Sequence, residues 1–110
     1  MIEKACKVFV LQLEIPILTV KHIIAFCKRE GIITVVNPAP TSNEFLLTDT
    51  IFDCIDYLIP NETESRLITG KLENGTTESL MDTLLDNRKM TVIMTLGSKG
   101  AYIGQNHQVE

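Results

Sequence analysis

Three short stretches of the sequence carry side chains and turns that could bind a charged or hydroxylated ligand. The first is PNETE, in which Asn61 and Glu64 stand at the expected start of a helix. Asn is a favoured N-cap residue, and Glu at the third helical position completes a capping box, which stabilises a helix by about 1 kcal/mol. The same helix start favours phosphate, and a carboxylate in its first turn could hold Mg²⁺ through water. Both interpretations, a helix cap and a phosphate and metal site, stay open.

The second stretch is TLGSKG, residues 95–100, in which Gly97 and Gly100 flank Ser98 and Lys99. Glycines in a turn allow positive φ and let a ligand approach the backbone. Consecutive backbone N–H groups in such a turn can form an anion-binding nest. A plain hairpin turn with a solvated Lys99 explains the same residues.

The third stretch is QLE, in which Glu14 stands where a predicted strand ends. A carboxylate at that position can accept hydrogen bonds from two hydroxyl groups, as sugar binding requires. The alternative interpretation is a carboxylate that simply faces water.

The elements that must position these stretches alternate between strand and helix. Continuously apolar runs predict strands over residues 6–13, 32–36, 54–59 and 91–96. A tight turn follows the last of these strands, and a partner strand is expected to return from residue 101 on. Apolar residues at helical spacing predict helices over residues 19–30, 44–52, 62–69 and 78–87. We expect Thr19 to cap the first helix, and Gly31 and Gly70 to end the first and third.

This alternation predicts an α/β fold with a mainly parallel sheet covered by helices on both faces. Residues 1–110 suit one small domain or one piece of a larger domain. Ligands of such sheets bind beyond the carboxyl ends of the strands. Glu14, Asn37, Asn61 and residues 95–97 all follow or close a predicted strand, which places the candidate residues at that edge. Neither Gly-x-Gly-x-x-Gly nor the Walker-type Gly-x-x-x-x-Gly-Lys-Ser/Thr pattern occurs, which disfavours the common nucleotide folds.

Composition narrows the functional classes. The chain is 45% apolar but only 5% aromatic, so the predicted core is aliphatic. A net charge of −4 without a basic run argues against nucleic acid as a partner, and no apolar run reaches membrane-spanning length. The three cysteines lie far apart and the N-terminus has no signal-peptide pattern, so we expect reduced thiols in a cytoplasmic protein.

The motifs QLEIP, NPAP, PNETE with ITG, and TLGSKGA occur in this order with natural strand–helix spacing. Together they resemble the middle of the ribokinase-like, PfkB-type carbohydrate kinases, and the resemblance spans essentially the whole chain. It implies a ribokinase-like fold: a partial three-layer α/β/α arrangement, mainly parallel, with the start of a C-terminal β-hairpin. It also implies ATP-dependent phosphorylation of D-ribose to D-ribose 5-phosphate in complete members, with Mg²⁺ as cofactor.

The same resemblance implies roles for single residues. Sugar binding falls on Glu14, and an influence on Mg²⁺, through water, falls on Glu64. Asn37 of NPAP would shape the site without contacting a ligand. The nucleotide-binding role falls on Asn61, Thr95, Gly97, Ser98, Lys99 and Gly100.

Several parts of the family pattern have no counterpart in this sequence. They are the Gly-Gly region and lid near the N-terminus, the C-terminal Gly-Ala-Gly-Asp-like loop with its anion hole and Asp base, and the monovalent-cation site near that loop. We therefore assign no catalytic residue. A general base contributes about 10²–10⁴ in rate and an anion-hole donor about 10²–10³, so we expect the isolated chain to be inactive.

The alternative hypothesis is a non-catalytic nucleotide-binding or interaction module derived from a sugar kinase. The expected partners are a small sugar and a nucleotide, with a homodimer expected for complete enzymes. A central slice of a parallel sheet leaves apolar surface bare, so we expect the chain to be marginally stable or to self-associate.

Overall fold

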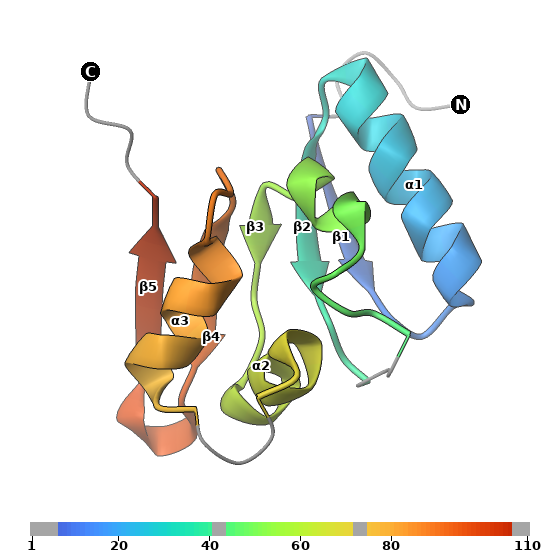
Figure 1. Cartoon of the computed structure of the whole chain (residues 1–110). Coiled ribbons are helices and arrows are strands. Elements are labelled where there is room, and N and C mark those ends of the chain that lie inside the picture. The colour runs from blue at the N-terminus through green and yellow to red at the C-terminus, as the bar shows by residue number, and fades with distance from the viewer. Residues whose placement is uncertain (1–6, 41–43, 72–74, 107–110) are drawn as a thin grey trace.

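The structure is a computed structural model that describes residues 7–40, 44–71 and 75–106 (Figure 1). Strands and helices alternate in it along the chain. The strands are β1 (Val8–Gln12), β2 (Ile33–Asn37), β3 (Tyr57–Leu58), β4 (Thr91–Thr95) and β5 (Ala101–Gln105). The α-helices are α1 (Ile17–Glu30), α2 (Glu62–Thr69) and α3 (Thr77–Leu85), and the 3₁₀ turns are η1 (Thr50–Cys54) and η2 (Gly97–Lys99).

The described strands form one sheet whose spatial order follows the chain, β1-β2-β3-β4-β5. Strands β1 to β4 are parallel, and β5 returns antiparallel to β4. The mainly parallel sheet and the C-terminal hairpin are therefore confirmed. Because crossovers between parallel strands are right-handed, a sheet that grows in one direction places every crossover on the same face.

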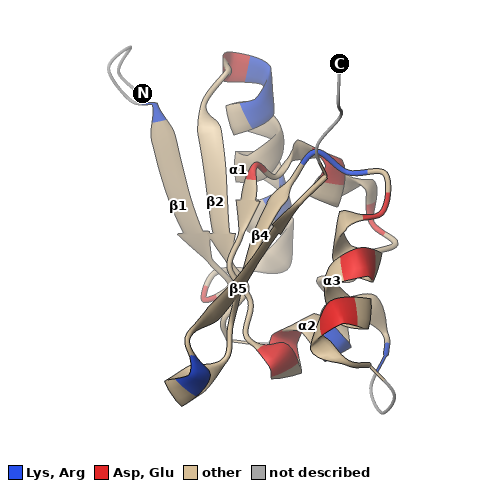
Figure 2. Cartoon of the chain, turned by 90° about the vertical axis from the view of Figure 1, so that its left-hand side faces the viewer, with Lys and Arg blue, Asp and Glu red and all other residues tan. Residues whose placement is uncertain are grey.

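Helices α1, α2 and α3 indeed lie on one side of the sheet (Figures 1 and 2). The prediction that helices cover both faces is thus wrong for the described residues, which form two layers. The core between these layers is aliphatic, as predicted. Its fully buried members include Val36, Leu58, Val92 and Met94 from the sheet, and Val20, Ile24, Leu80 and Leu84 from the helices.

The predicted helix over residues 44–52 is wrong. Turns occupy residues 44–49, and the 3₁₀ turn η1 follows them. Asp49 caps η1, because its carboxylate accepts a hydrogen bond from the Ile51 N–H. Phe45 and Phe52 are both buried, with ring centroids 4.6 Å apart. Packing of these two rings, rather than a helical stripe, explains the apolar spacing of this segment.

The first helix also starts earlier than predicted, at Ile17, with Pro16 at the N-cap and no side-chain cap from Thr19. Proline suits a helix start because its fixed φ is close to the helical value and its missing N–H has no acceptor there. Gly31 ends α1 and Gly70 ends α2, both with left-handed backbone, as predicted.

Candidate functional site

The N-terminus of α2 carries a complete capping box. The Asn61 Oδ1 atom accepts a hydrogen bond from the Glu64 N–H at 2.7 Å, and the Glu64 Oε1 atom accepts one from the Asn61 N–H at 2.9 Å. Glu64 is buried and Asn61 is exposed. The capping interpretation of this motif is therefore confirmed.

The capping box leaves other groups at the helix start unused. Helix geometry gives the N–H groups of Glu62 and Thr63 no acceptor within α2. Neither residue is among the site residues predicted from the sequence, although the first two positions of any helix carry this signal. They give the start of α2 donors, and a positive dipole end, that an anion could use.

The glycine turn lies directly beside this helix start. Thr95 forms a parallel bridge with Asn61, and the Thr95 N–H donates a hydrogen bond to the Pro60 carbonyl at 2.8 Å. Both features belong to the edge at which the parallel strands end, here called the carboxyl edge (the lower edge in Figure 1). The predicted adjacency of the helix tip and the turn is thus present in the structure.

The turn itself depends on its two glycines. Gly97 has φ +63° and Gly100 has φ +96°, values that other residues adopt only with strain. The Leu96 N–H donates to the Gly100 carbonyl at 2.8 Å and closes the turn. Ser98 and Lys99 are exposed at its tip, so the Lys99 charge is accessible to a ligand.

The carboxylates near the helix tip have distinct partners. Glu62 Oε2 accepts a hydrogen bond from the Thr77 hydroxyl at 2.9 Å, which links the starts of α2 and α3. Glu64 uses Oε1 for the capping box, which leaves Oε2 for another partner. The described residues contain no cluster of three or more His, Cys, Asp or Glu side chains suited to a metal. A Mg²⁺ ion near Glu64 would therefore take most of its ligands from water and phosphate, as Mg²⁺ often does.

Glu14 lies at the same edge but apart from the turn. It follows β1, is exposed, and lines a shallow hollow with Gln12 and Ile15 among others. The Leu13 N–H donates to the Ala39 carbonyl at 2.9 Å, which ties this strand end to the NPAP segment. Strands β2 and β3 separate β1 from β4, so Glu14 lies about three strand spacings, roughly 14 Å, from the glycine turn.

The structure thus brings Asn61, Glu64 and the turn of residues 95–100 together, and it places Glu14 on the same edge without contact to them. Asn37 lies between them, at the end of β2. The Ala39–Pro40 peptide bond, in the segment that follows, is cis.

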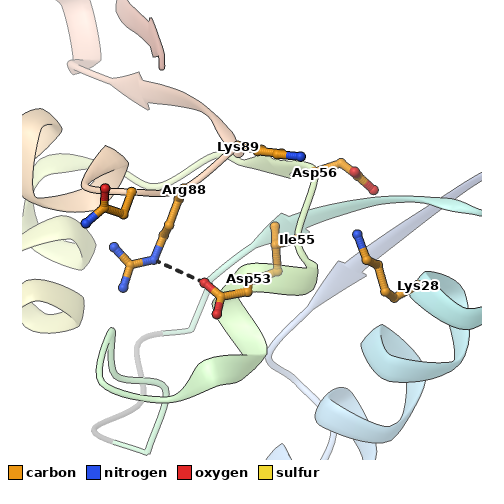
Figure 3. Close-up of a pocket in the computed structure, with 7 residues that line it drawn as sticks. Lys28, Asp53, Ile55, Asp56, Arg88 and Lys89 are labelled. Carbon is orange, nitrogen blue, oxygen red and sulfur yellow. Dashed lines mark ion pairs between the residues drawn. The ribbon is translucent and has the colours of Figure 1, made fainter. Parts of the chain in front are cut away.

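A second hollow lies at the opposite edge, near the amino ends of β3 and β4 (Figure 3). Its charged lining residues have both signs: Lys28, Asp53, Asp56, Arg88 and Lys89. Arg88 donates hydrogen bonds to carbonyls at the end of α3 and to the Leu47 carbonyl, so its guanidinium serves the fold. None of the predicted site residues lies there.

No helix in residues 7–40, 44–71 and 75–106 combines the length and apolarity needed to cross a bilayer.

The sequence profile described as "pfkB family carbohydrate kinase" matches residues 2–110. A deoxyribokinase of Salmonella typhi is 39% identical over 105 residues, covering 89% of this chain and 32% of that protein. A ribokinase of Staphylococcus aureus is 36% identical over 103 residues, covering 90% of this chain and 32% of the relative.

Solved structures show the same ribokinase-like fold. The ribokinase from Giardia lamblia superposes with a TM-score of 0.74 at 28% identity, over 91% of this chain and 33% of that one. Arabidopsis thaliana ribokinase complexed with ribose and ATP gives a TM-score of 0.69 at 27% identity, over 93% and 33%. The chain therefore spans about a third of the length of the proteins it resembles.

Proposed function

Because the chain belongs to the pfkB family of carbohydrate kinases, we propose that it carries one part of the site of a ribokinase-like enzyme. The proposed reaction transfers the γ-phosphate of ATP to D-ribose and yields D-ribose 5-phosphate. The bridge between Asn61 and Thr95 is the observation that carries this proposal, because it sets a helix N-terminus beside a glycine turn.

The proposed nucleotide-binding part is the carboxyl edge at α2 and β4. The N–H groups of Glu62 and Thr63, the backbone of residues 97–100 and the Lys99 ammonium supply donors and positive charge for the phosphates of ATP. The Asn61 amide N–H₂ adds a further donor, since the capping box uses only the amide oxygen. The resemblance to an Arabidopsis ribokinase complexed with ribose and ATP supports this assignment.

Glu64 is the proposed residue for Mg²⁺, through bound water. Bound beside the ATP phosphates, Mg²⁺ would neutralise part of their charge. The role of Glu64 would be to orient water at that position with Oε2 while Oε1 holds the helix start. One carboxylate with one oxygen committed to the cap suits an ion that keeps several waters.

Glu14 is the proposed sugar-binding residue. Its exposed carboxylate can accept hydrogen bonds from two neighbouring hydroxyl groups, and the link from Leu13 to Ala39 holds its backbone in place. Relatives named ribokinase and deoxyribokinase both match the chain, and a carboxylate that takes two hydroxyls favours the substrate that retains both. On this argument ribose is the proposed acceptor.

We further propose that the isolated chain binds Mg·ATP without turning it over. The site residues named above hold ligands, and none is the Asp base that the resemblance implies. The absence of both a general base and an anion hole would reduce the rate of phosphoryl transfer by a factor of roughly 10⁴–10⁷. A non-catalytic nucleotide-binding module is the second candidate, because the residues proposed for the site bind ligands and none of them is a general base.

The test combines a coupled assay for ADP release, with ATP and D-ribose, and calorimetric titration with Mg·ATP. We expect binding without turnover above background. Turnover close to that of a complete sugar kinase would overturn the proposed inactivity. Absence of ATP binding by a folded chain would overturn the nucleotide site itself. Phosphorylation of D-ribose when the chain is joined to the remainder of a related kinase would separate the kinase fragment from the non-catalytic module.

A further inference from the structure

Two side-chain amides lie next to each other at the carboxyl edge, close to Glu14. Gln12 ends β1 and Asn37 ends β2, and the parallel register pairs these two residues directly. The two strand ends are neighbours in Figure 1. Adjacent strands lie about 4.8 Å apart, and paired residues project from the same face of the sheet. One small ligand can therefore contact both amides.

Strand alternation places both amides on the sheet face opposite the helices. In β1, Leu11 is buried in the core, whereas Val10 on the other side is 64% exposed, and Gln12 follows Val10 with the strand period of two. In β2, Val36 is buried in the core and Asn37 projects to the opposite side. Neither amide therefore belongs to the aliphatic core between sheet and helices.

Both amides are available to a ligand. Within residues 7–40, 44–71 and 75–106, the side chains of Gln12 and Asn37 form no hydrogen bond with another protein group. The amide of Gln105, by contrast, donates a hydrogen bond to the Thr91 hydroxyl at 3.0 Å. A free amide offers both of its N–H donors and its carbonyl acceptor. Asn37 is also half-buried, so its donors and acceptor are confined to a few directions.

The hollow beside these amides has the lining that a neutral sugar requires. Gln12 and Glu14 line a hollow of about 270 Å³, and the other lining residues are apolar: Val10, Leu11 and Ile15. Among the described residues that line it, Glu14 carries the only charge. Apolar walls with a few convergent polar groups are typical of small-molecule sites. Without a cation in its lining, this hollow suits hydroxyl groups and not a phosphate.

We propose that Gln12 and Asn37 bind the sugar together with Glu14 and select a neutral, hydroxyl-rich ligand. This inference rests on the proposed function, in which Glu14 takes the sugar. An ionised carboxylate only accepts hydrogen bonds, whereas an amide also donates them, so the three side chains together match both the donors and the acceptors of sugar hydroxyls. The family resemblance gives Asn37 a shaping role only, and the register with Gln12 adds a direct contact.

A nuclear magnetic resonance titration of the ¹⁵N-labelled full chain with D-ribose tests the contact. The sugar is added to about 100 mM, because a few hydrogen bonds give millimolar affinity at best. We expect the side-chain N–H₂ signals of Gln12 and Asn37 to shift along one saturating curve with the backbone signal of Glu14. The amides of Asn87 and Gln105 lie at the opposite edge and serve as internal controls that should not shift.

Gln12→Met and Asn37→Leu preserve much of the side-chain volume but remove the hydrogen-bonding groups. Each should raise the Kd for D-ribose about threefold to tenfold, as expected for the loss of a neutral hydrogen bond. Gln105→Met is the matched control and should leave this Kd unchanged. Circular dichroism and a cooperative urea transition establish that each variant is folded. If Asn37→Leu does not fold, Asn37→Val replaces it, because valine suits a strand.

The outcomes separate this inference from the proposed function. Shifts at Glu14 without shifts at the two amides overturn the inference and leave Glu14 as the sugar-binding residue. If D-ribose shifts none of the three residues while Mg·ATP still binds, the whole sugar subsite is overturned and the nucleotide part remains. An equal loss of affinity in Gln105→Met also overturns the inference. A folded chain that binds neither D-ribose nor Mg·ATP overturns the inference and the proposed function together.

Discussion

At the scale of single residues, Asn61 can satisfy both interpretations of its motif at once. Its Oδ1 atom accepts the Glu64 N–H in the capping box, which leaves the amide N–H₂ as a donor on an exposed side chain. Asp would cap the helix as well, but an ionised carboxylate has no donor to offer a phosphate. Helix capping and phosphate binding therefore use different atoms of one side chain, and substitutions can separate them.

Asn61→Asp separates the two roles. Aspartate keeps the cap acceptor and favours the positive helix end, so the free energy of unfolding should stay within about 0.5 kcal/mol of the parent. Its negative charge should lower ATP affinity at least about tenfold, because like charges meet at the phosphates. Asn61→Ala should instead cost about 1 kcal/mol of stability as well as affinity. Unchanged ATP affinity of Asn61→Asp, measured by calorimetry, would leave the residue as a cap alone.

Glu64→Gln tests the proposed Mg²⁺ role. Glutamine retains an oxygen that can accept the Asn61 N–H, so the capping box survives while the charge is lost. Loss of the charge near the helix N-terminus should cost about 0.3–1 kcal/mol of stability. The increase in ATP affinity on adding Mg²⁺ should become smaller in the variant. An equal Mg²⁺ effect in parent and variant contradicts a metal role for Glu64.

At the scale of elements, local hydrogen bonds define the short pieces that hold the site. The eight-residue helix α2 has a capping box at one end and a left-handed glycine at the other, and the hairpin of β4 and β5 has a turn closed by glycine. Such short elements are marginal by themselves, so their end groups contribute a large share of their stability. Changes at these ends should therefore be measurable.

Gly100→Ala tests the hairpin turn. Gly100 has φ +96° and ψ −132°, a conformation essentially restricted to glycine, so alanine should cost about 1–3 kcal/mol. A Cβ atom there would meet nothing within 4 Å, so the cost reflects backbone strain and not a clash. Ser98→Ala, in the same turn but exposed, should change stability by less than about 0.5 kcal/mol. Equal urea midpoints for the two variants would contradict this account of the turn.

The ion pair between α1 and the segment before η1 predicts a dependence on acid. Lys21 Nζ lies 2.5 Å from Asp49 Oδ2, and this hydrogen bond, with that from the Ile51 N–H, lowers the pKa of Asp49. A lowered folded-state pKa contributes stability above the unfolded value of about 3.9, and this stability is lost as pH falls through the folded pKa. Lys21→Met should lower stability at pH 7 by less than about 1 kcal/mol, since the pair is partly exposed.

The difference in unfolding free energy between parent and Lys21→Met should shrink as the pH falls below about 4, where Asp49 becomes protonated in both. Urea unfolding at several pH values measures it. A difference that stays constant down to pH 2 would mean that Lys21 stabilises the fold through its alkyl chain and not through Asp49.

At the scale of the whole molecule, the sequential strand order has one dominant consequence. Every parallel crossover lies on one face, so one side of the sheet is packed and the other exposes aliphatic side chains. The related kinases are about three times as long as the matched region. The sheet face opposite the helices is thus where additional polypeptide contributes most to stability.

The sequence by itself determined the local pieces of this protein. Helix α2, its capping box and its terminal Gly70 were predicted to the residue, because caps satisfy helix ends with groups only a few residues away. The carboxyl-edge placement of Asn61 and the glycine turn was predictable too, since parallel strands end at one edge.

Only the tertiary structure decided the rest. The segment of residues 44–52 became turns because Phe45 packs on Phe52, a contact that competes with helical hydrogen bonds. Strand order decided which sheet face is covered by helices. An apolar strand such as β1 has the same sequence pattern whether or not another element packs on its second face. Burial of that face depends on contacts between distant segments, which local periodicity does not encode.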